Sequence, residues 1–250
     1  MKYLFLSLAS CILVSYNVFC QPKTPIHSDT INKLIQPAAN VSPLAIINRY
    51  IDLIGGMDRL KEVKTLYIQS EVILKVTNIT SVLKRMAPNK EYNTMSIMDL
   101  TVLTKTVFDG TNGYKIIDGK KIPFTTEEIK QKQEEHSLFP ELYFIENNFA
   151  LTVEGIEKVN EKDAYKIRAV SPSGNITYRF YDVETGLIVR ADIKPVGDPD
   201  FYTSIVSNYK PVKGILFPFT IVTTLHDKQQ MYIKSTEIKI NEGVTEGDFK

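Results

Sequence analysis

The spacing of apolar residues changes along the chain from a helical period to a strand period. Within residues 42–54, large apolar side chains recur every three or four positions, which is typical of an amphipathic helix. A Ser-Pro pair at the start suits the N-cap and the first helical position, and a Gly-Gly pair follows the end. We predict a helix here and a short second turn at residues 57–63. The recurring residues are Leu44, Ile47, Ile51 and Ile54.

From residue 65 the apolar period becomes two. Within residues 65–76, apolar side chains occupy one face with little interruption, and Thr, Gln, Glu and Lys occupy the other, which predicts a half-buried antiparallel strand. Similar segments continue to the end of the chain, and Asp-Gly, Ser-Gly, Thr-Gly and Lys-Gly pairs supply turns between several of them. The further predicted strands are residues 81–87, 91–98, 102–108, 113–117, 150–159, 164–170, 176–183, 187–193, 202–209, 217–225 and 231–240.

One helix is predicted within this run of strands, at residues 125–138. Two threonines and two glutamates open it with a cap and an acidic first turn, and it ends before Pro140. The segment is so polar that only a thin stripe, such as Ile129 and Leu138, can be buried, and such helices lie on a surface or cover an opening. The fold class is therefore mainly β (α+β): a large curved antiparallel sheet or incomplete β-barrel, with an N-terminal helix and an inserted lid-like helix.

The first twenty residues have the pattern of a secretory signal peptide. Lys2 precedes an apolar stretch at residues 3–16 that is interrupted only by serines. An uncleaved membrane anchor is the alternative, but a span needs ~20 apolar residues. Cleavage after Cys20 gives a soluble product, whereas acylation of Cys20 gives an outer-membrane lipoprotein, against which the bulky Phe19 argues. We expect a signal peptide at residues 1–20, a linker or loosely docked arm at 21–41, and a single domain at 42–250.

Composition changes once this segment is removed. Both cysteines lie within it, and loss of Lys2 leaves 29 basic against 29 acidic residues, a formal net charge of zero. A chain without cysteine has no thiol nucleophile, no Cys-ligated metal and no disulfide. A neutral chain offers no basic field for nucleic acid, so we expect no nucleic-acid partner.

The search for catalytic and metal-binding residues finds no motif. His27, His136 and His226 are far apart in the sequence, and the chain has no GxSxG serine-hydrolase signature. Asp198 and Asp200 could give oxygens to calcium, but one short loop does not supply six ligands. We assign no catalytic, cofactor-binding or metal-binding residue and predict that the protein is not an enzyme. An unrecognised carboxylate or tyrosine site is the competing hypothesis.

The 13 tyrosines and 12 phenylalanines give the strands large apolar surfaces. A curved sheet either fills its concave face with such side chains or encloses a cavity with them, and an ordinary core is the alternative to a ligand cavity here. The predicted cavity lining is Leu66, Ile68, Val72, Leu74, Ile176, Tyr178, Phe180, Phe217, Phe219 and Ile221.

Several segments resemble a known family. They are YIDLIGGMDRLKEVKTL at residues 50–66, VFDG at 107–110, GIEKVN at 155–160, YDVETGL at 181–187 and GILFPF at 214–219. They are similar to the outer-membrane lipoprotein-sorting (LolA/LolB-like) superfamily in secreted proteins of Bacteroidetes-type bacteria, and to modules at the C-terminus of insulinase-type peptidases. The resemblance implies an incomplete barrel with helices as a lid around a cavity for acyl chains, and it transfers no ligand-binding residue.

The functional prediction follows from the secretion pattern, the strands and this resemblance. We expect a non-enzymatic periplasmic or secreted protein, without cofactor, that binds lipid or an acylated protein in the hydrophobic concavity of an open barrel. The alternative is a solid-cored interaction module that docks onto a partner in the cell envelope, such as an insulinase-type peptidase.

Overall fold

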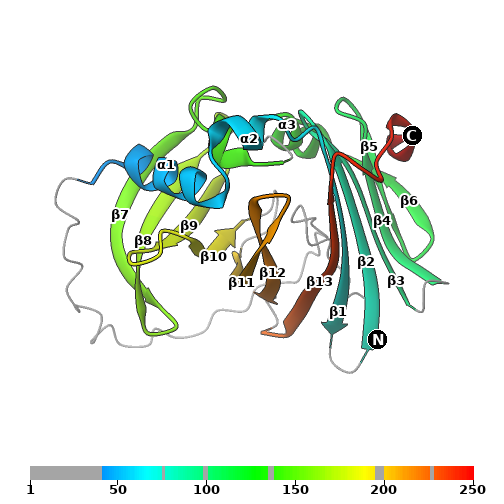
Figure 1. The fold of residues 1–250 in the computed structure, drawn as a ribbon. Coiled ribbons are helices and arrows are strands. Elements are labelled where there is room, and N and C mark those ends of the chain that lie inside the picture. Colours follow the sequence, from blue (N-terminus) through cyan, green and yellow to red (C-terminus); the bar gives the residue numbers. More distant parts are fainter. Residues whose placement is uncertain (1–40, 75–76, 98–100, 135–137, 195–199, 226–227) are drawn as a thin grey trace, which may run out of the picture.

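One antiparallel sheet contains every strand among the described residues. The computed structural model describes residues 41–250 apart from 75–76, 98–100, 135–137, 195–199 and 226–227, so the expected signal peptide and nearly all of the expected arm lie outside the described residues. Thirteen strands follow the order β6-β5-β4-β3-β2-β1-β13-β12-β11-β10-β9-β8-β7. The prediction of a mainly β, curved antiparallel sheet is confirmed (Figure 1). The strands are β1 Thr65–Leu74, β2 Thr77–Met86, β3 Lys90–Ile97, β4 Thr101–Phe108, β5 Gly113–Ile117, β6 Lys120–Pro123, β7 Ala150–Val159, β8 Lys162–Val170, β9 Ile176–Asp182, β10 Ile188–Ile193, β11 Tyr202–Val212, β12 Ile215–Thr224 and β13 Gln230–Ile240.

The two halves of the sequence join in the middle of the sheet. The first strand, β1, pairs with the last, β13, and Leu66 lies opposite Ile240. Every other neighbouring pair of strands is consecutive in the sequence, so each half is a meander that ends in an edge strand, β6 or β7. The sheet bends so that β7–β9 stand on one side and β1–β6 on the other, with the helices along one end (Figure 1).

The helices agree with the predicted pattern in place but not in every boundary. The N-terminal helix α1 buries Ile47, Ile51 and Ile54 as predicted, together with Tyr50, whereas Leu44 at its start is 40% exposed. The inserted helix α3 is described over Thr126–Glu134, where none of its residues is buried, and residues 135–137 of the predicted helix lie outside the described residues. The helices are α1 Pro43–Ile54, α2 Met57–Lys61, α3 Thr126–Glu134, and the short 3-10 helices η1 Pro140–Tyr143 and η2 Glu246–Phe249.

One strand was missed by the sequence pattern. The edge strand β6 has only four residues, all exposed, and ends in Pro123, so it has no apolar alternation and no strong strand propensity. The turn before it was recognisable: Asp118 and Gly119 have φ of 50° and 74°, as an Asp-Gly hairpin turn requires. A two-residue turn with a strand on one side implies a partner strand on the other.

Helix α1 is held to the turn between β9 and β10 by polar contacts. The Arg49 guanidinium donates hydrogen bonds to the carbonyl oxygens of Val183 and Glu184, at 2.9 and 2.6 Å. Gly186 lies beneath the helix, where a Cβ atom would be 2.6 Å from Cδ1 of Leu53. The turn therefore needs a glycine both for its positive φ of 78° and for the close approach of α1.

We expect Gly186→Ala to lower the free energy of unfolding by about 2 kcal/mol, of which about 1 kcal/mol is left-handed strain and the rest the displacement of the Leu53 and Arg49 side chains of α1. Gly119→Ala is the matched control, because its φ of 74° is nearly the same and no atom lies within 4 Å of an added Cβ. Urea denaturation of both variants would measure the difference. Equal losses would show that the contact with α1 contributes nothing.

Candidate functional site

The inner face of the sheet, defined as the face that carries α1, has one end filled by protein side chains. Apolar residues of α1 and of residues 138–144 pack there against β8, β9, β10, β12, β13 and β1. The rings of Phe139 and Phe217 lie 6.0 Å apart, and those of Tyr50 and Tyr181 meet edge to face at 5.6 Å. This filled cluster consists of Ile46, Ile47, Tyr50, Ile51, Ile54, Leu60, Val63, Leu66, Leu138, Phe139, Leu142, Phe144, Ile167, Ala169, Tyr181, Ile188, Ile215, Phe217, Ile238 and Ile240.

A second apolar cluster lies farther along the same face. Its buried residues come from β1, β2, β3, β11 and β13 and from Leu225, directly after β12, so the bent sheet brings side chains from both halves of the sequence together. We call it the strand cluster. Its members are Val72, Leu74, Ile79, Met95, Tyr202, Leu225, Met231 and Ile233.

Between the two clusters lies a less buried patch on three strands, β2, β1 and β12. Ile68 on β1 is paired with Leu83 on β2, and Phe219 and Ile221 lie on β12, with β13 between β12 and β1. All four side chains are half-buried, whereas their neighbours in both clusters are buried. We call these four residues the central patch. Apolar surface of these four side chains is accessible without unpacking either cluster.

The predicted lining residues separate between two faces of the sheet. Leu66, Ile68, Phe217 and Phe219 belong to or border the filled cluster, and Val72, Leu74 and Ile221 belong to or border the strand cluster, so these seven lie on the inner face. Tyr178 and Phe180 pack elsewhere, with Val159 and Ala164. Since successive side chains of a strand point to opposite faces, Ile176, Tyr178 and Phe180 share the face of β9 opposite to Tyr181. They are not brought together with the other seven.

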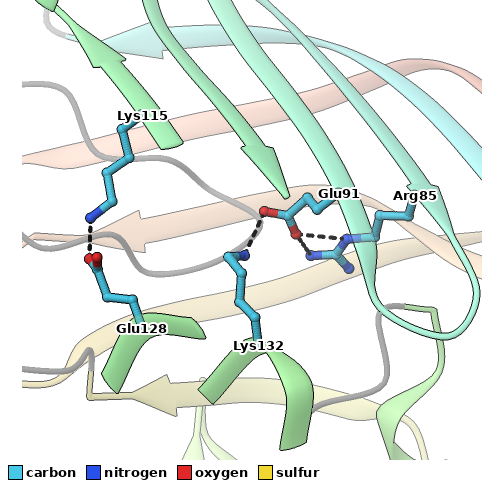
Figure 2. Close-up of polar contacts among 5 residues, drawn as sticks. All are labelled: Arg85, Glu91, Lys115, Glu128 and Lys132. Carbon is cyan, nitrogen blue, oxygen red and sulfur yellow. Dashed lines mark hydrogen bonds and ion pairs between the residues drawn. The ribbon is translucent and has the colours of Figure 1, made fainter. Parts of the chain in front are cut away.

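Helix α3 is fixed to the inner face by ion pairs (Figure 2). Glu128 pairs with Lys115 on β5, and Lys132 Nζ lies 2.9 Å from Glu91 Oε1 on β3. Arg85 on β2 completes the network, with Nη2 3.0 Å from Glu91 Oε2. The Glu91 side chain is only 4% exposed and that of Lys115 only 6%. The helix is therefore docked by buried charges rather than by an apolar stripe.

The local sequence of α3 explains this docking. Glu128 and Lys132 are four residues apart and so lie on one face of the helix. The Glu128 carboxylate also accepts a hydrogen bond from the amide of Thr125, while the Thr125 hydroxyl accepts one from the amide of Glu128, forming a capping box. Burial lowers the pKa of Lys115, an effect that its hydrogen bond to Glu128 opposes. One carboxylate thus both starts the helix and anchors it.

The other end of α3 reaches the opposite half of the sheet. The Glu134 carboxylate accepts hydrogen bonds from the hydroxyl and the amide of Ser173, in the turn between β8 and β9. The backbone carbonyl of Glu134 accepts a hydrogen bond of 2.8 Å from the side chain of Asn147. Helix α3 therefore spans the concavity from β3–β5 to the β8–β9 turn. The prediction that this segment is a lid-like helix agrees with its place.

The sequence pattern missed the charged partners of α3. Glu91, Asn93 and Met95 alternate on β3 and are all buried, so two of three inner positions on this strand are polar. The alternation of apolar and polar residues therefore does not predict which face of β3 points inward. The available signal was the spacing of Glu128 and Lys132, which places two opposite charges on the same face of the helix.

Three tyrosines lie together beneath α1, of which Tyr50 and Tyr181 are buried and Tyr209 is half-buried. Burial raises the pKa of Tyr50 and Tyr181 well above that of a free phenol, and it also raises the pKa of Tyr209. The Tyr209 hydroxyl donates to the carbonyl oxygen of Ile188 at 2.9 Å. A phenol that holds its proton this firmly is a poor general base or nucleophile at neutral pH. This argues against the tyrosine-site hypothesis for these three residues.

No metal site is found in the described part of the chain, where no three His, Cys, Asp or Glu side chains are grouped to hold an ion. His27, His136 and His226 all lie outside the described residues, as does Asp198 of the loop considered for calcium. Among the helices that the structure describes, none has the length and apolar character needed to cross a membrane.

Comparisons with known proteins identify the fold. No protein-family model matches the chain, and no curated protein matches it. Solved structures do match the chain, among them three with TM-scores above 0.5. A DUF1329 family protein from Desulfovibrio piger ATCC 29098 has a TM-score of 0.54 at 12% identity, covering 84% of this chain and 98% of that chain. A putative outer membrane lipoprotein-sorting protein domain from Vibrio parahaemolyticus has a TM-score of 0.53 at 12% identity, covering 82% of this chain and 95% of that chain.

The third is a LolA superfamily protein from Nitrosomonas europaea, with a TM-score of 0.56 at 9% identity, covering 84% of this chain and 98% of that chain. At such identities the likeness concerns the fold. The open, bent sheet of this chain shares its fold with these three structures, and this fold agrees with the incomplete barrel that the resemblance in sequence implied.

Proposed function

We propose that this protein is a non-enzymatic carrier of the cell envelope that binds the acyl chain of a lipid or of a lipidated protein on its inner face. The observation that carries the proposal is the central patch, four half-buried apolar side chains between two buried clusters on the face that α3 spans. Each methylene moved from water onto such a surface gains ~0.8 kcal/mol. A chain of a dozen or more methylenes therefore binds without any catalytic or charged group.

The proposed location rests on the N-terminal sequence. A signal peptide at residues 1–20 would deliver the chain to the periplasm or the exterior, and acylation of Cys20 would tether it to the outer membrane. The fold supports this location, because one solved structure that shares it is a putative outer membrane lipoprotein-sorting protein domain. Mass spectrometry of the N-terminus of the processed protein distinguishes a free Gln21 from an acylated Cys20.

Binding is tested with tryptophan variants, because the chain has no tryptophan of its own. We expect Ile221→Trp, in the central patch, to weaken the binding of cis-parinaric acid severalfold by filling the patch, with energy transfer from tryptophan to the bound ligand as the signal in each titration. Ile205→Trp is the matched control and binds as the parent protein does: Ile205 is also half-buried on a neighbouring strand, but it borders the opposite-face cluster of Val159, Ala164 and Phe180. Equal affinities of the two variants would contradict the proposal, and so would native mass spectra and lipid extracts of the purified protein without any acyl ligand.

A docking module is the second candidate. The observation that favours it is the filled cluster under α1, together with Leu44, Leu53 and Met57 on α1 and α2, whose side chains are 40–43% exposed. In this case the partner is an envelope protein such as an insulinase-type peptidase, and the outer side of α1 is the contact. Leu53→Glu would then abolish co-purification with that peptidase, while the central-patch variants would retain it.

A further inference from the structure

The inner face carries a patch of buried polar side chains beside the central patch. In the strand register, Asn93 on β3 lies opposite Leu83 on β2 and Thr106 on β4. The next row inward contains Ser81, Met95 and Thr104, in the same order of strands. All of these except the half-buried Leu83 are buried. A hydroxyl- and amide-rich surface thus adjoins the apolar side chains of Leu83 and Met95, and on its other side the charged side chains of Arg85 and Glu91.

Asn93 is the unusual member of this patch. Its side chain is 97% buried, since the residue is 3% exposed, yet its carbonyl oxygen Oδ1 has no hydrogen-bond partner within the described chain. A buried acceptor without a donor costs about 1–3 kcal/mol. An apolar residue of the same size would avoid that cost, so the fold alone gives no reason for an asparagine here. A buried polar group without a partner calls for an explanation, and a functional role is one of them.

The surroundings of Asn93 indicate what kind of group would meet it. The charges near Asn93 are already matched within the protein. Glu91, in the adjoining row, is paired with Arg85 and Lys132, and Lys115, in the row of Asn93, is paired with Glu128. The group without a partner is the carbonyl oxygen of Asn93, which is neutral and needs a hydrogen-bond donor. Met95, two residues along on the same face of β3, belongs to the strand cluster, and Leu83 belongs to the central patch. A ligand donor at Asn93 would thus lie at the border of the surface proposed for the acyl chain.

We propose that Asn93 binds the neutral, hydrogen-bond-donating head group of an amphiphile, a hydroxyl or an amide, whose acyl chain lies on the central patch. This inference rests on the proposed function and specifies its ligand class: glycerides or N-acyl amides rather than esters without a donor or fatty-acid anions. Helix α3, anchored at Glu91 and Lys115, covers the row next to the head group.

The test compares ligands that share one oleoyl chain. Oleamide and monoolein donate hydrogen bonds, methyl oleate does not, and oleate is anionic. We expect the full chain to bind oleamide and monoolein about tenfold more tightly than methyl oleate, measured by displacement of cis-parinaric acid. In Asn93→Leu the preference disappears while methyl oleate binds as before, and the midpoint of thermal unfolding does not fall. Thr94→Val, on the opposite face of β3, is the control and leaves both affinities unchanged.

The outcomes separate this inference from the proposed function. Equal affinity for oleamide and methyl oleate overturns the role of Asn93 and leaves the carrier function standing. Tighter binding of oleate than of either amide or glyceride also overturns it, because the head-group site would then be cationic. Failure of all four to bind overturns the carrier function itself. If Asn93→Leu does not fold, Asn93→Ala removes the same acceptor without adding a branched side chain, and the same loss of preference is required of it.

Discussion

Glu91→Gln lowers the free energy of unfolding by about 3 kcal/mol, which is the largest effect we expect from a single substitution outside the apolar clusters. The carboxylate of Glu91 neutralises both Arg85 and Lys132, and all three side chains are at least four-fifths buried. A neutral amide in its place leaves two cations close together in a poorly solvated site. The ion pairs that dock Lys132 of α3 are lost with the charge.

Two measurements check this result. Urea denaturation gives the loss of stability, and hydrogen exchange of the amides in Thr126–Glu134 reports whether α3 has detached. Asp163→Asn is the matched control, because it removes a carboxylate from an ion pair of similar length, 3.0 Å between Asp163 Oδ1 and Lys158 Nζ. In this pair the Asp163 side chain is 57% exposed and the Lys158 side chain is 64% exposed. We expect it to cost less than 1 kcal/mol. Similar losses in the two variants would show that burial does not strengthen the network at Glu91.

Alkaline pH produces the second large effect. Tyr50, Tyr181 and Tyr209 all have pKa values raised by burial, so the folded protein keeps three protons that the unfolded chain releases near pH 10. A group with a raised folded pKa contributes stability that is fully present below its unfolded pKa and is lost as the pH rises toward its folded pKa. Three such groups lower the free energy of unfolding by about 4 kcal/mol between pH 8 and pH 11. The lowered pKa of Lys115 acts in the opposite direction near pH 10.

Tyr181→Phe tests the origin of this pH dependence. The Tyr181 hydroxyl is buried and has no hydrogen-bond partner among the described residues, so its removal costs little at neutral pH. We expect the variant to lose about a third less stability between pH 8 and pH 11 than the parent protein, as measured by urea denaturation at each pH. Tyr232→Phe, at a side chain that is 48% exposed, is the control and leaves the pH dependence unchanged. An identical slope in all three proteins would place the alkaline sensitivity elsewhere.

The alternation of apolar side chains was sufficient to predict most of the fold. On β1, Leu66, Ile68, Val72 and Leu74 all lie on the inner face, as the period of two requires. The same rule could not decide which face of β9 is inside, because Phe180 and Tyr181 are both fully buried, on opposite faces. A strand that is apolar on both faces has no pattern to interpret, and only the packing of Tyr50 against Tyr181 settles its orientation.

The polar part of the candidate site was not predictable from local sequence. Glu91 and Lys115 are separated from their partners on α3 by 41 and 13 residues, and their pairing depends on where the helix crosses the sheet. Asn93 is an ordinary polar residue in a strand until the register places it between Leu83 and Thr106 in a buried row. Long-range register, which the hydrophobic period does not encode, determines these neighbours.

The pairing of β1 with β13 has a consequence for how the chain reaches its folded state. The central ladder joins residues about 170 positions apart, such as Leu66 and Ile240, so it closes only when almost the whole polypeptide is available. Contacts of such sequence separation form slowly, because a long loop must be closed before they contribute. An incomplete chain therefore lacks its middle strand pair, and its two meanders stay unjoined. The sheet becomes continuous only when the last strand, Gln230–Ile240, is present.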